Sequence, residues 1–426
     1  MLGAWLVATA IAGSGVAPSP APPRVVGAAG AYAAPAATPD TRRRREGVTR
    51  AERDRQRGFG ARVHRFLPVP SFRAEPAIGL TFGLRARYVY RPPDQQFDRV
   101  RVDLVGLVST RLVQDHSLTV ETRDLLHRQE IVDLGLFFDD DPVFPYIGIA
   151  DDTFYRQVQL QNDYFRISRR TIAGSLSYQQ PFAVVERGRW GMKTTGYARW
   201  FVGTRFAYDE LRADETTRYA EDTGTTDVEV RRGGVMGGIA WDSRDNGWSP
   251  VRGSLHDASV ELGGPWMASS RTWVRANASM RFYRPLGTDK LILANQFLAD
   301  FIMGDAPLVP QGEFGGLRVR EGIGGRDLGR GFYRRRFVGR RKLYASAEIR
   351  FEPWEFRIFR RYLSPGLKVF TDVGSAAAPP RFLSRAPHIS GGGGAYLVWD
   401  RFFVLRFDAG VSEEGLGLYV TANHAF

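Results

Sequence analysis

The residues of this chain best suited to chemistry are an arginine in a glycine-rich loop and a carboxylate further along the chain. Arg330 lies in the run GGRDLGRGFY at positions 324–333, and Asp372 lies in the segment FTDVG at 370–374. Period-two alternation places Asp372 on the polar face of a strand. A buried arginine needs such a partner, because an unpaired charge inside a protein costs several kcal/mol. Loop and strand together predict a plug held inside a barrel.

A catalytic site would need a nucleophile, a base and an orienting group that converge at one depth. The histidines are scattered, and none has a serine or aspartate at motif-like spacing: His64, His116, His127, His256, His388 and His424. We expect His256 and His424 to point into a wet lumen. The acidic runs 139–141 and 151–152 could hold a divalent cation, but solvated turn carboxylates are the simpler interpretation. We therefore predict no enzyme activity, no metal and no cofactor.

The composition fits a membrane β-protein better than a nucleic-acid-binding protein. The 426 residues carry a formal net charge of +13, with a mean hydropathy of −0.28 and no cysteine. Beyond the N-terminus no apolar run is long enough for a membrane helix, whereas transmembrane strands alternate and keep average hydropathy low. Nucleic-acid binding calls for clustered Lys and Arg. Here the arginines are spread along strands and opposed by Asp and Glu, which predicts a lumen coated with mixed charge and no nucleic-acid partner.

The sequence divides into three parts. Residues 1–37 are apolar and then rich in Ala, Pro and Gly, which predicts a cleaved secretory signal, although no Lys or Arg precedes Arg24. A short membrane anchor is the alternative. Residues 38–70 are predicted to be a charged periplasmic linker, and residues 71–426 the barrel.

Hydrophobic periodicity defines the fold class. Between Lys342 and Glu352 every odd position is apolar and every even position is polar or aromatic with a hydroxyl group. Similar alternation recurs in long segments, whereas strands of a soluble β-sandwich are shorter. We predict an all-β protein, a transmembrane antiparallel β-barrel of about 16 strands with a loop folded into the lumen. Five strands follow the Arg330 loop. Parity then makes 208–228 and 304–340 outer loops and 242–250 a periplasmic turn.

At this point the chain resembles the BamA/TamA outer-membrane assembly family, the bacterial surface antigen barrels that include two-partner secretion transporters. Four features carry the resemblance, in matching order and spacing. They are Arg330-Gly331-Phe332 at a loop tip, Phe370-x-Asp372-x-Gly374 two strands later, Ala347-Glu348-Ile349-Arg350 on the strand between, and the turn Asp242-x-Arg244-Asp245-Asn246 leading to Pro250 and Gly253.

The resemblance implies roles for these residues. Arg330 would pair with Asp372 and, as a second partner, Glu348, both of which the alternation places on polar faces. Gly331 would permit a close approach or a positive φ, and Phe332 would pack against the inner wall. The terminal Phe426, after a strand with Leu416, Leu418, Val420 and Ala422 on one face, resembles the C-terminal recognition strand of outer-membrane barrels.

The resemblance also implies a function. We expect a monomeric barrel without POTRA domains in the outer membrane of a Gram-negative bacterium, in contact with membrane lipid and lipopolysaccharide. It would assist insertion or translocation of a protein or lipid client through a weak seam between its first and last strands. A separate periplasmic or surface protein would be its partner. The alternative is a passive pore or a structural scaffold for a surface partner.

Overall fold

The fold is that of a computed structural model. It describes residues 64–426 except 91, 93–97, 127, 151–153, 190–191, 359–360, 385 and 402, and before them only β1 (Val25–Val26). Side chains at 65, 67 and 186–195 are also outside the description. Apart from β1, the predicted signal and most of the predicted linker therefore lie outside the described residues.

Sixteen antiparallel strands form the wall of a closed barrel, which confirms the predicted fold class and strand number. They are β2 (His64–Glu75), β3 (Gly79–Tyr90), β4 (Val100–Ser109), β5 (Gln114–Arg123), β6 (Ile131–Pro145), β7 (Arg166–Arg189), β8 (Met192–Arg212), β9 (Asp227–Asp242), β10 (Gly253–Gly263), β11 (Trp273–Leu286), β12 (Thr288–Gly304), β15 (Arg341–Phe351), β17 (Arg361–Ala377), β18 (His388–Trp399), β19 (Phe403–Ser412) and β20 (Gly415–Ala422). Each strand pairs with its neighbours in chain order, and β20 closes the ring against β2.

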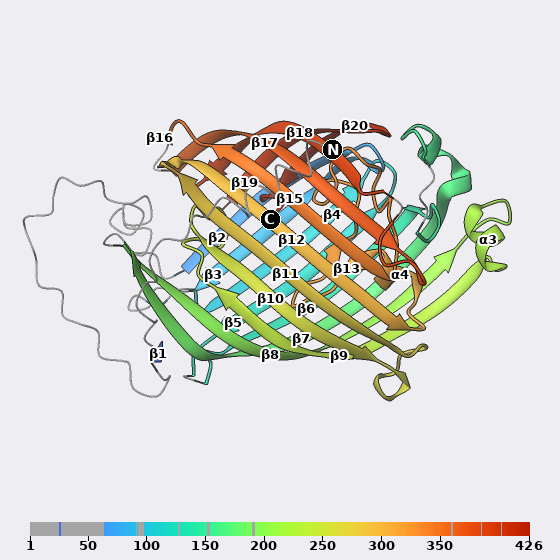
Figure 1. The fold of residues 1–426 in the computed structure, drawn as a ribbon, viewed down its shortest axis with the longest axis horizontal. Helices are drawn as coiled ribbons and strands as arrows, with labels where there is room; N and C mark the ends of the chain where they lie inside the picture. Colours follow the sequence, from blue (N-terminus) through green and yellow to red (C-terminus); the bar gives the residue numbers. More distant parts are fainter. Residues whose placement is uncertain are drawn as a thin grey trace, which may run out of the picture.

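Short elements lie in the connections between the wall strands. They are β13 (Glu313–Phe314), β14 (Arg320–Glu321), β16 (Phe356–Ile358), α3 (Arg218–Thr223), α4 (Leu308–Gln311), η1 (Gln159–Gln161), η2 (Asp163–Phe165) and η3 (Pro265–Met267). Figure 1 shows α3 and α4 at one end and β16 at the other. The long loops at 213–226 and 305–340 thus share an end, as parity predicts. None of the described helices has the length and apolar character to cross a membrane.

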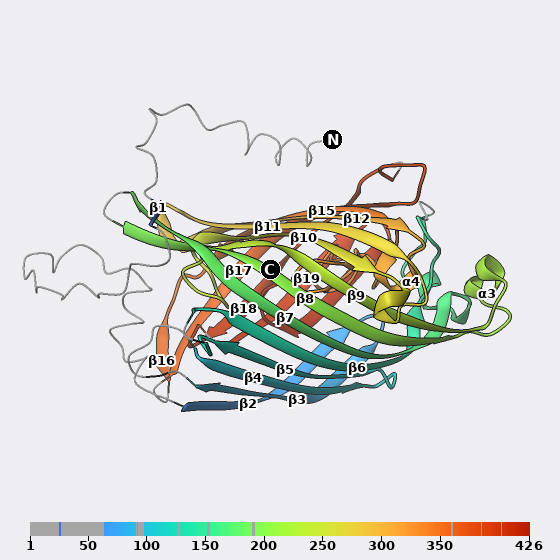
Figure 2. The ribbon, with the colours of Figure 1, turned by 90° about the horizontal axis from the view of Figure 1, so that it is seen from below.

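The wall places apolar residues outside and charges inside. On β15 the side chains of Lys342, Glu348 and Arg350 are buried, whereas Ile349 and Phe351 are each 43% exposed. The opposite arrangement is expected of a protein with a hydrophobic core in water. Figure 2 shows the strands tilted around the barrel, with the β7–β8 hairpin reaching beyond its rim.

Two chain segments depart from the predicted boundaries. The first wall strand begins at His64, before the predicted start at residue 71. The prediction was late because Pro68 and Pro70 obscure the strand pattern in the sequence. The last strand ends at Ala422, where Asn423 adopts a φ of 68° and turns the chain inward. The ring of Phe426 is therefore buried beside Tyr283 instead of continuing the outward face.

Candidate functional site

Arg330 lies inside the barrel, and its guanidinium and main-chain N–H meet three buried carboxylates. Nε and Nη2 each donate to Asp372 at 3.0 Å, and the Arg330 N–H donates to the same carboxylate at 3.0 Å. Nη1 is 2.5 Å from Glu348 and 3.5 Å from Asp408. A guanidinium forms this fork-shaped contact with a carboxylate better than an ammonium does.

On β17, the alternate positions Phe370, Asp372 and Gly374 face inward and contact the loop. The Arg330 guanidinium lies 3.5 Å from the centre of the Phe370 ring, a cation–π contact. Asp372 binds the same guanidinium. A Cβ at Gly374 would lie 2.7 Å from the side chain of Ile323, so the glycine makes room for the loop. Aromatic, acid and glycine at alternate positions therefore form one docking face.

Gly331 brings the loop tip against the backbone of β19. Its φ is 106°, and a Cβ there would lie 2.8–2.9 Å from main-chain atoms of Val411 and Gly410. Phe332 is buried in a cluster with Leu298, Phe337 and Tyr344. The tip thus combines an ion cluster, a tight backbone approach and an apolar anchor.

The electrostatics keep Arg330 charged. Burial alone would lower the pKa of its guanidinium, but Asp372 and Glu348 outweigh burial and raise that pKa well above its usual value. Lys368 and Arg350 also contact Glu348, at 3.4 Å and 2.7 Å. The cluster is therefore a set of mutually compensating buried charges.

The loop between β12 and β15 is fastened around much of the barrel. Every residue from 328 to 339 is buried. Beyond the Arg330 cluster, the contacts are Arg326 with Glu75 of β2, Arg318 with Glu121 of β5, Arg334 with Asp141 of β6, the carbonyls of Gly316 and Leu317 with Arg205 of β8, the N–H of Gly315 with Asp300 of β12, and Arg336 with Glu414 before β20. This segment fills the lumen as a plug.

The turn between β9 and β10 closes on itself at the other end of the barrel. Arg244 donates to Asp242 from Nε and Nη2, at 3.0 and 2.9 Å. Asp245 accepts from the N–H of Val251 at 2.9 Å, and Asn246 accepts from that of Trp248 at 2.8 Å.

The rest of the turn faces the barrel interior. Pro250 is buried, and Gly253 has a φ of 96° where a Cβ would meet the carbonyl of Ser243. Trp248 lies 3.7 Å from the guanidinium of Arg87 on β3. Ser249 contacts His424 of the tail at 3.3 Å. The turn therefore packs across this mouth.

Some polar residues lie in places that the sequence did not indicate. His256 shares the parity of the exposed Val260 and Leu262, and its ring packs against that of Phe282 with the centroids 4.7 Å apart. It therefore lies on the outward side of the wall, and its predicted lumen position is wrong. The carboxylates 139–141 are paired with arginines rather than solvated. The run 151–152 is outside the described residues. No group of described His, Asp or Glu residues could hold a metal ion.

Two partners of the loop were missed as site residues. Asp408 joins the Arg330 cluster, and its place on the polar face of its strand was the available signal. Glu75 binds Arg326 of the loop although the two residues are far apart in the chain, and no pattern in the sequence connects them.

Comparison with protein-family models decides the family. The model described as the Omp85 superfamily domain matches residues 108–414. The chain belongs to the Omp85 superfamily. This membership confirms the predicted resemblance. It also confirms the predicted location of this Omp85 barrel, the outer membrane of a Gram-negative bacterium.

Solved structures show the same fold at low identity. BamA from Haemophilus ducreyi lacking POTRA domains 1–3 is 12% identical, with a TM-score of 0.52 over 85% of this chain and 70% of that chain. CdiB from Escherichia coli is 11% identical, with a TM-score of 0.55 over 84% of this chain and 62% of that chain. No curated protein is similar to the sequence.

Proposed function

We propose that this Omp85 barrel inserts or translocates a protein or lipid client at the outer membrane by parting the seam between β2 and β20. The observation that carries the proposal is the pairing of these strands. They share one residue pair, Ala74 with Val420, whereas β19 and β20 are paired from Leu405–Ala422 to Ser412–Gly415. A seam with so few ladder hydrogen bonds is the cheapest place to open the wall.

Two prolines explain why the seam is short. Continuing the antiparallel register would set Pro70 opposite His424 and Pro68 opposite Phe426. Proline has no N–H to donate, and it is tolerated in a strand at a free edge. The β2–β3 ladder runs unbroken through both prolines, so their missing donors face β20. The tail would find two donors missing if it stayed in the wall, and it turns into the lumen instead.

The plug argues against the passive pore. Loop side chains are held by charges on strands around the barrel, and the β9–β10 turn packs across the opposite mouth. A steady aqueous channel would need these contacts to be absent. We also propose that the barrel performs no enzymatic step and works as a monomer in contact with membrane lipid and lipopolysaccharide. A separate periplasmic or surface protein would be its partner.

Planar bilayers and depleted cells test the function. The reconstituted barrel should stay mostly closed, and Arg330→Ala should destabilise it or raise its conductance. Cells depleted of the protein should lose a subset of outer-membrane proteins or lipids. Steady conductance that is the same in Arg330→Ala, together with an unchanged outer-membrane composition in the depleted cells, would favour the pore.

A further inference from the structure

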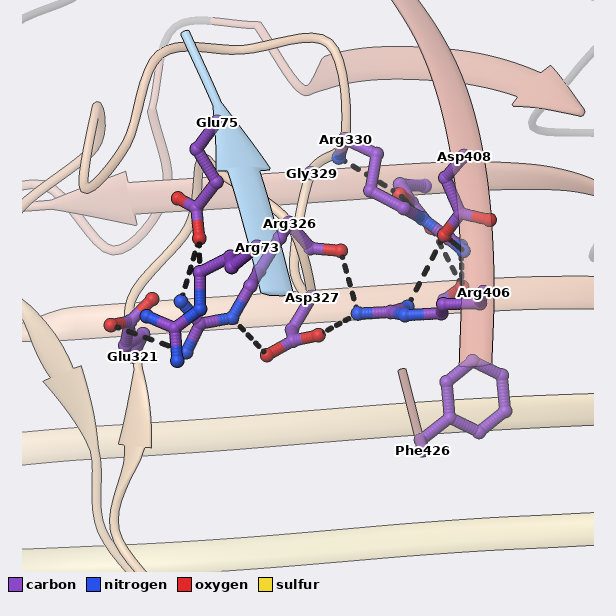
Figure 3. A network of polar contacts seen from close by, with 12 residues as sticks. Arg73, Glu75, Glu321, Arg326, Asp327, Gly329, Arg330, Arg406, Asp408 and Phe426 are labelled. Atoms are coloured by element: carbon purple, nitrogen blue, oxygen red, sulfur yellow. Dashed lines mark hydrogen bonds and ion pairs between the residues drawn. The ribbon is translucent and has the colours of Figure 1, made fainter. Parts of the chain in front are cut away.

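Two adjacent charges in the plug reach strands on opposite sides of the seam. The Arg326 guanidinium is 2.7 Å from Glu75, near the end of β2. Asp327 pairs with Arg406 on β19, the neighbour of β20. Arg406 continues to Asp408 at 3.2 Å, and Asp408 belongs to the Arg330 cluster. Figure 3 shows this chain of contacts from Glu75 to Asp408.

A tight turn holds the two charges side by side. The N–H of Gly324 donates to the carbonyl of Leu328 at 2.7 Å, and Gly324 and Gly325 have φ values of 107° and 106°. Arg326 Nε lies 3.3 Å from Asp327. Both charges therefore lie at the tip of one turn, so a displacement of the turn breaks both contacts.

The contacts are largely shielded from solvent. The side chains of Glu75 and Arg406 are 2% and 0% exposed, and those of Arg326 and Asp327 are 14% and 34% exposed. Burial would lower the pKa of Arg326, but Glu321, Glu75 and Asp327 outweigh burial and raise it well above its usual value. The guanidinium stays charged, and its separation from Glu75 would break the shortest ion pair of both groups and leave Glu75 with Arg73 at 3.8 Å.

The loop is anchored more firmly on the β20 side. The Tyr419 hydroxyl accepts from the N–H of Gly331 at 3.1 Å and donates to the carbonyl of Phe332 at 3.3 Å. Arg330 fastens the same loop to β15, β17 and β19. On β2, by contrast, the described ion pair to the loop is the one between Glu75 and Arg326. The loop should therefore stay with the last strands when the first strand moves away.

We propose that Arg326 and Asp327 form an ionic staple across the seam, which keeps the barrel shut and must be released before β2 and β20 part. The staple rests on the proposed function, because it regulates the opening through which a client would pass. Its two arms are Glu75–Arg326 and Asp327–Arg406. Arg330 and Tyr419 hold the loop to the last strands beside the second arm, so loss of the Glu75 arm should free the seam more than loss of the Asp327 arm.

Spin-label distances across the seam test the staple. The chain has no cysteine, so Phe72→Cys on β2 and Leu418→Cys on β20 give one label pair on the outer face. The wild-type background should show mainly short distances. Arg326→Gln should raise the open fraction about tenfold, Asp327→Asn should raise it less, and the double variant should do no more than Arg326→Gln.

A matched buried pair supplies the control. Arg169→Gln removes the contact to Asp139 between β7 and β6, which share a long ladder, and it should leave the seam distances unchanged. Heat-dependent mobility on gels verifies that each variant has folded. Distances unchanged in Arg326→Gln, or equal opening by Arg169→Gln, would overturn the staple. The distances are measured without an activity assay. If the staple variants open the seam but the protein still functions with its seam locked, the staple stands and only the proposed function is refuted.

Discussion

At the scale of single residues, the Arg330 cluster is the feature most sensitive to substitution. Arg330→Ala would leave Asp372, Glu348 and Asp408 buried near one another without their shared cation. Breaking a buried pair by removing one partner costs about 3–5 kcal/mol. We expect a loss of that order in the free energy of unfolding, measured by urea titration with gel mobility as the probe.

Arg330→Lys should recover only part of this loss, because an ammonium cannot make the two parallel contacts to Asp372. Arg271→Ala is the control, since its pair with Asp305 is more than half exposed and should contribute about 0–1 kcal/mol. Equal stability of Arg330→Ala and Arg271→Ala would contradict a structural role for the cluster.

Gly331 gives a second prediction at this scale. Gly331→Ala would add a Cβ against the β19 backbone at a position where φ is 106°. We expect a destabilisation of about 1–3 kcal/mol, with a displaced loop tip. Gly247→Ala adds its Cβ in open space and should be nearly neutral. Similar melting of the two variants in detergent would show that the close approach to β19 is unnecessary.

At the scale of elements, the prolines of β2 should determine how long the seam is. Replacing Pro68 and Pro70 by valine restores two N–H donors opposite the tail. Each added hydrogen bond contributes about 0.5–1.5 kcal/mol, so the tail should spend more time in the wall. Hydrogen exchange of residues 415–426 should slow relative to the parent protein.

Pro353→Val, in the turn after β15, is the matched control and should leave that exchange unchanged. Unaltered exchange in the double valine variant would show that something other than the missing donors turns the tail inward.

The elements also show what the sequence could predict. Period-two alternation was enough for the barrel and the strand number, and it put Glu348 and Asp372 on inward faces. It could not predict that β2 begins at His64, because prolines resemble a linker in sequence. Nor could it predict the inward turn at Asn423 or the contact between Arg326 and Glu75. These depend on the path of the chain in space, and alternation carries no information about that path.

At the scale of the whole molecule, the barrel has a plugged lumen, a short seam and a bridge across that seam. The loop is fastened to the last strands by buried charges and to the first strand by Glu75. Opening therefore divides the wall at one place rather than loosening the barrel everywhere. Insertion or translocation of a client then depends on the opening of the seam.

A reversible lock across the seam tests this claim most directly. Ala74→Cys and Val420→Cys occupy the one paired position of β2 and β20, and Ala409→Cys with Leu418→Cys makes a control pair between β19 and β20. Oxidation of the seam pair should abolish the rescue of depleted cells, and reduction should restore it, whereas the control pair should rescue in both states. Full rescue by the oxidised, locked seam would contradict the account.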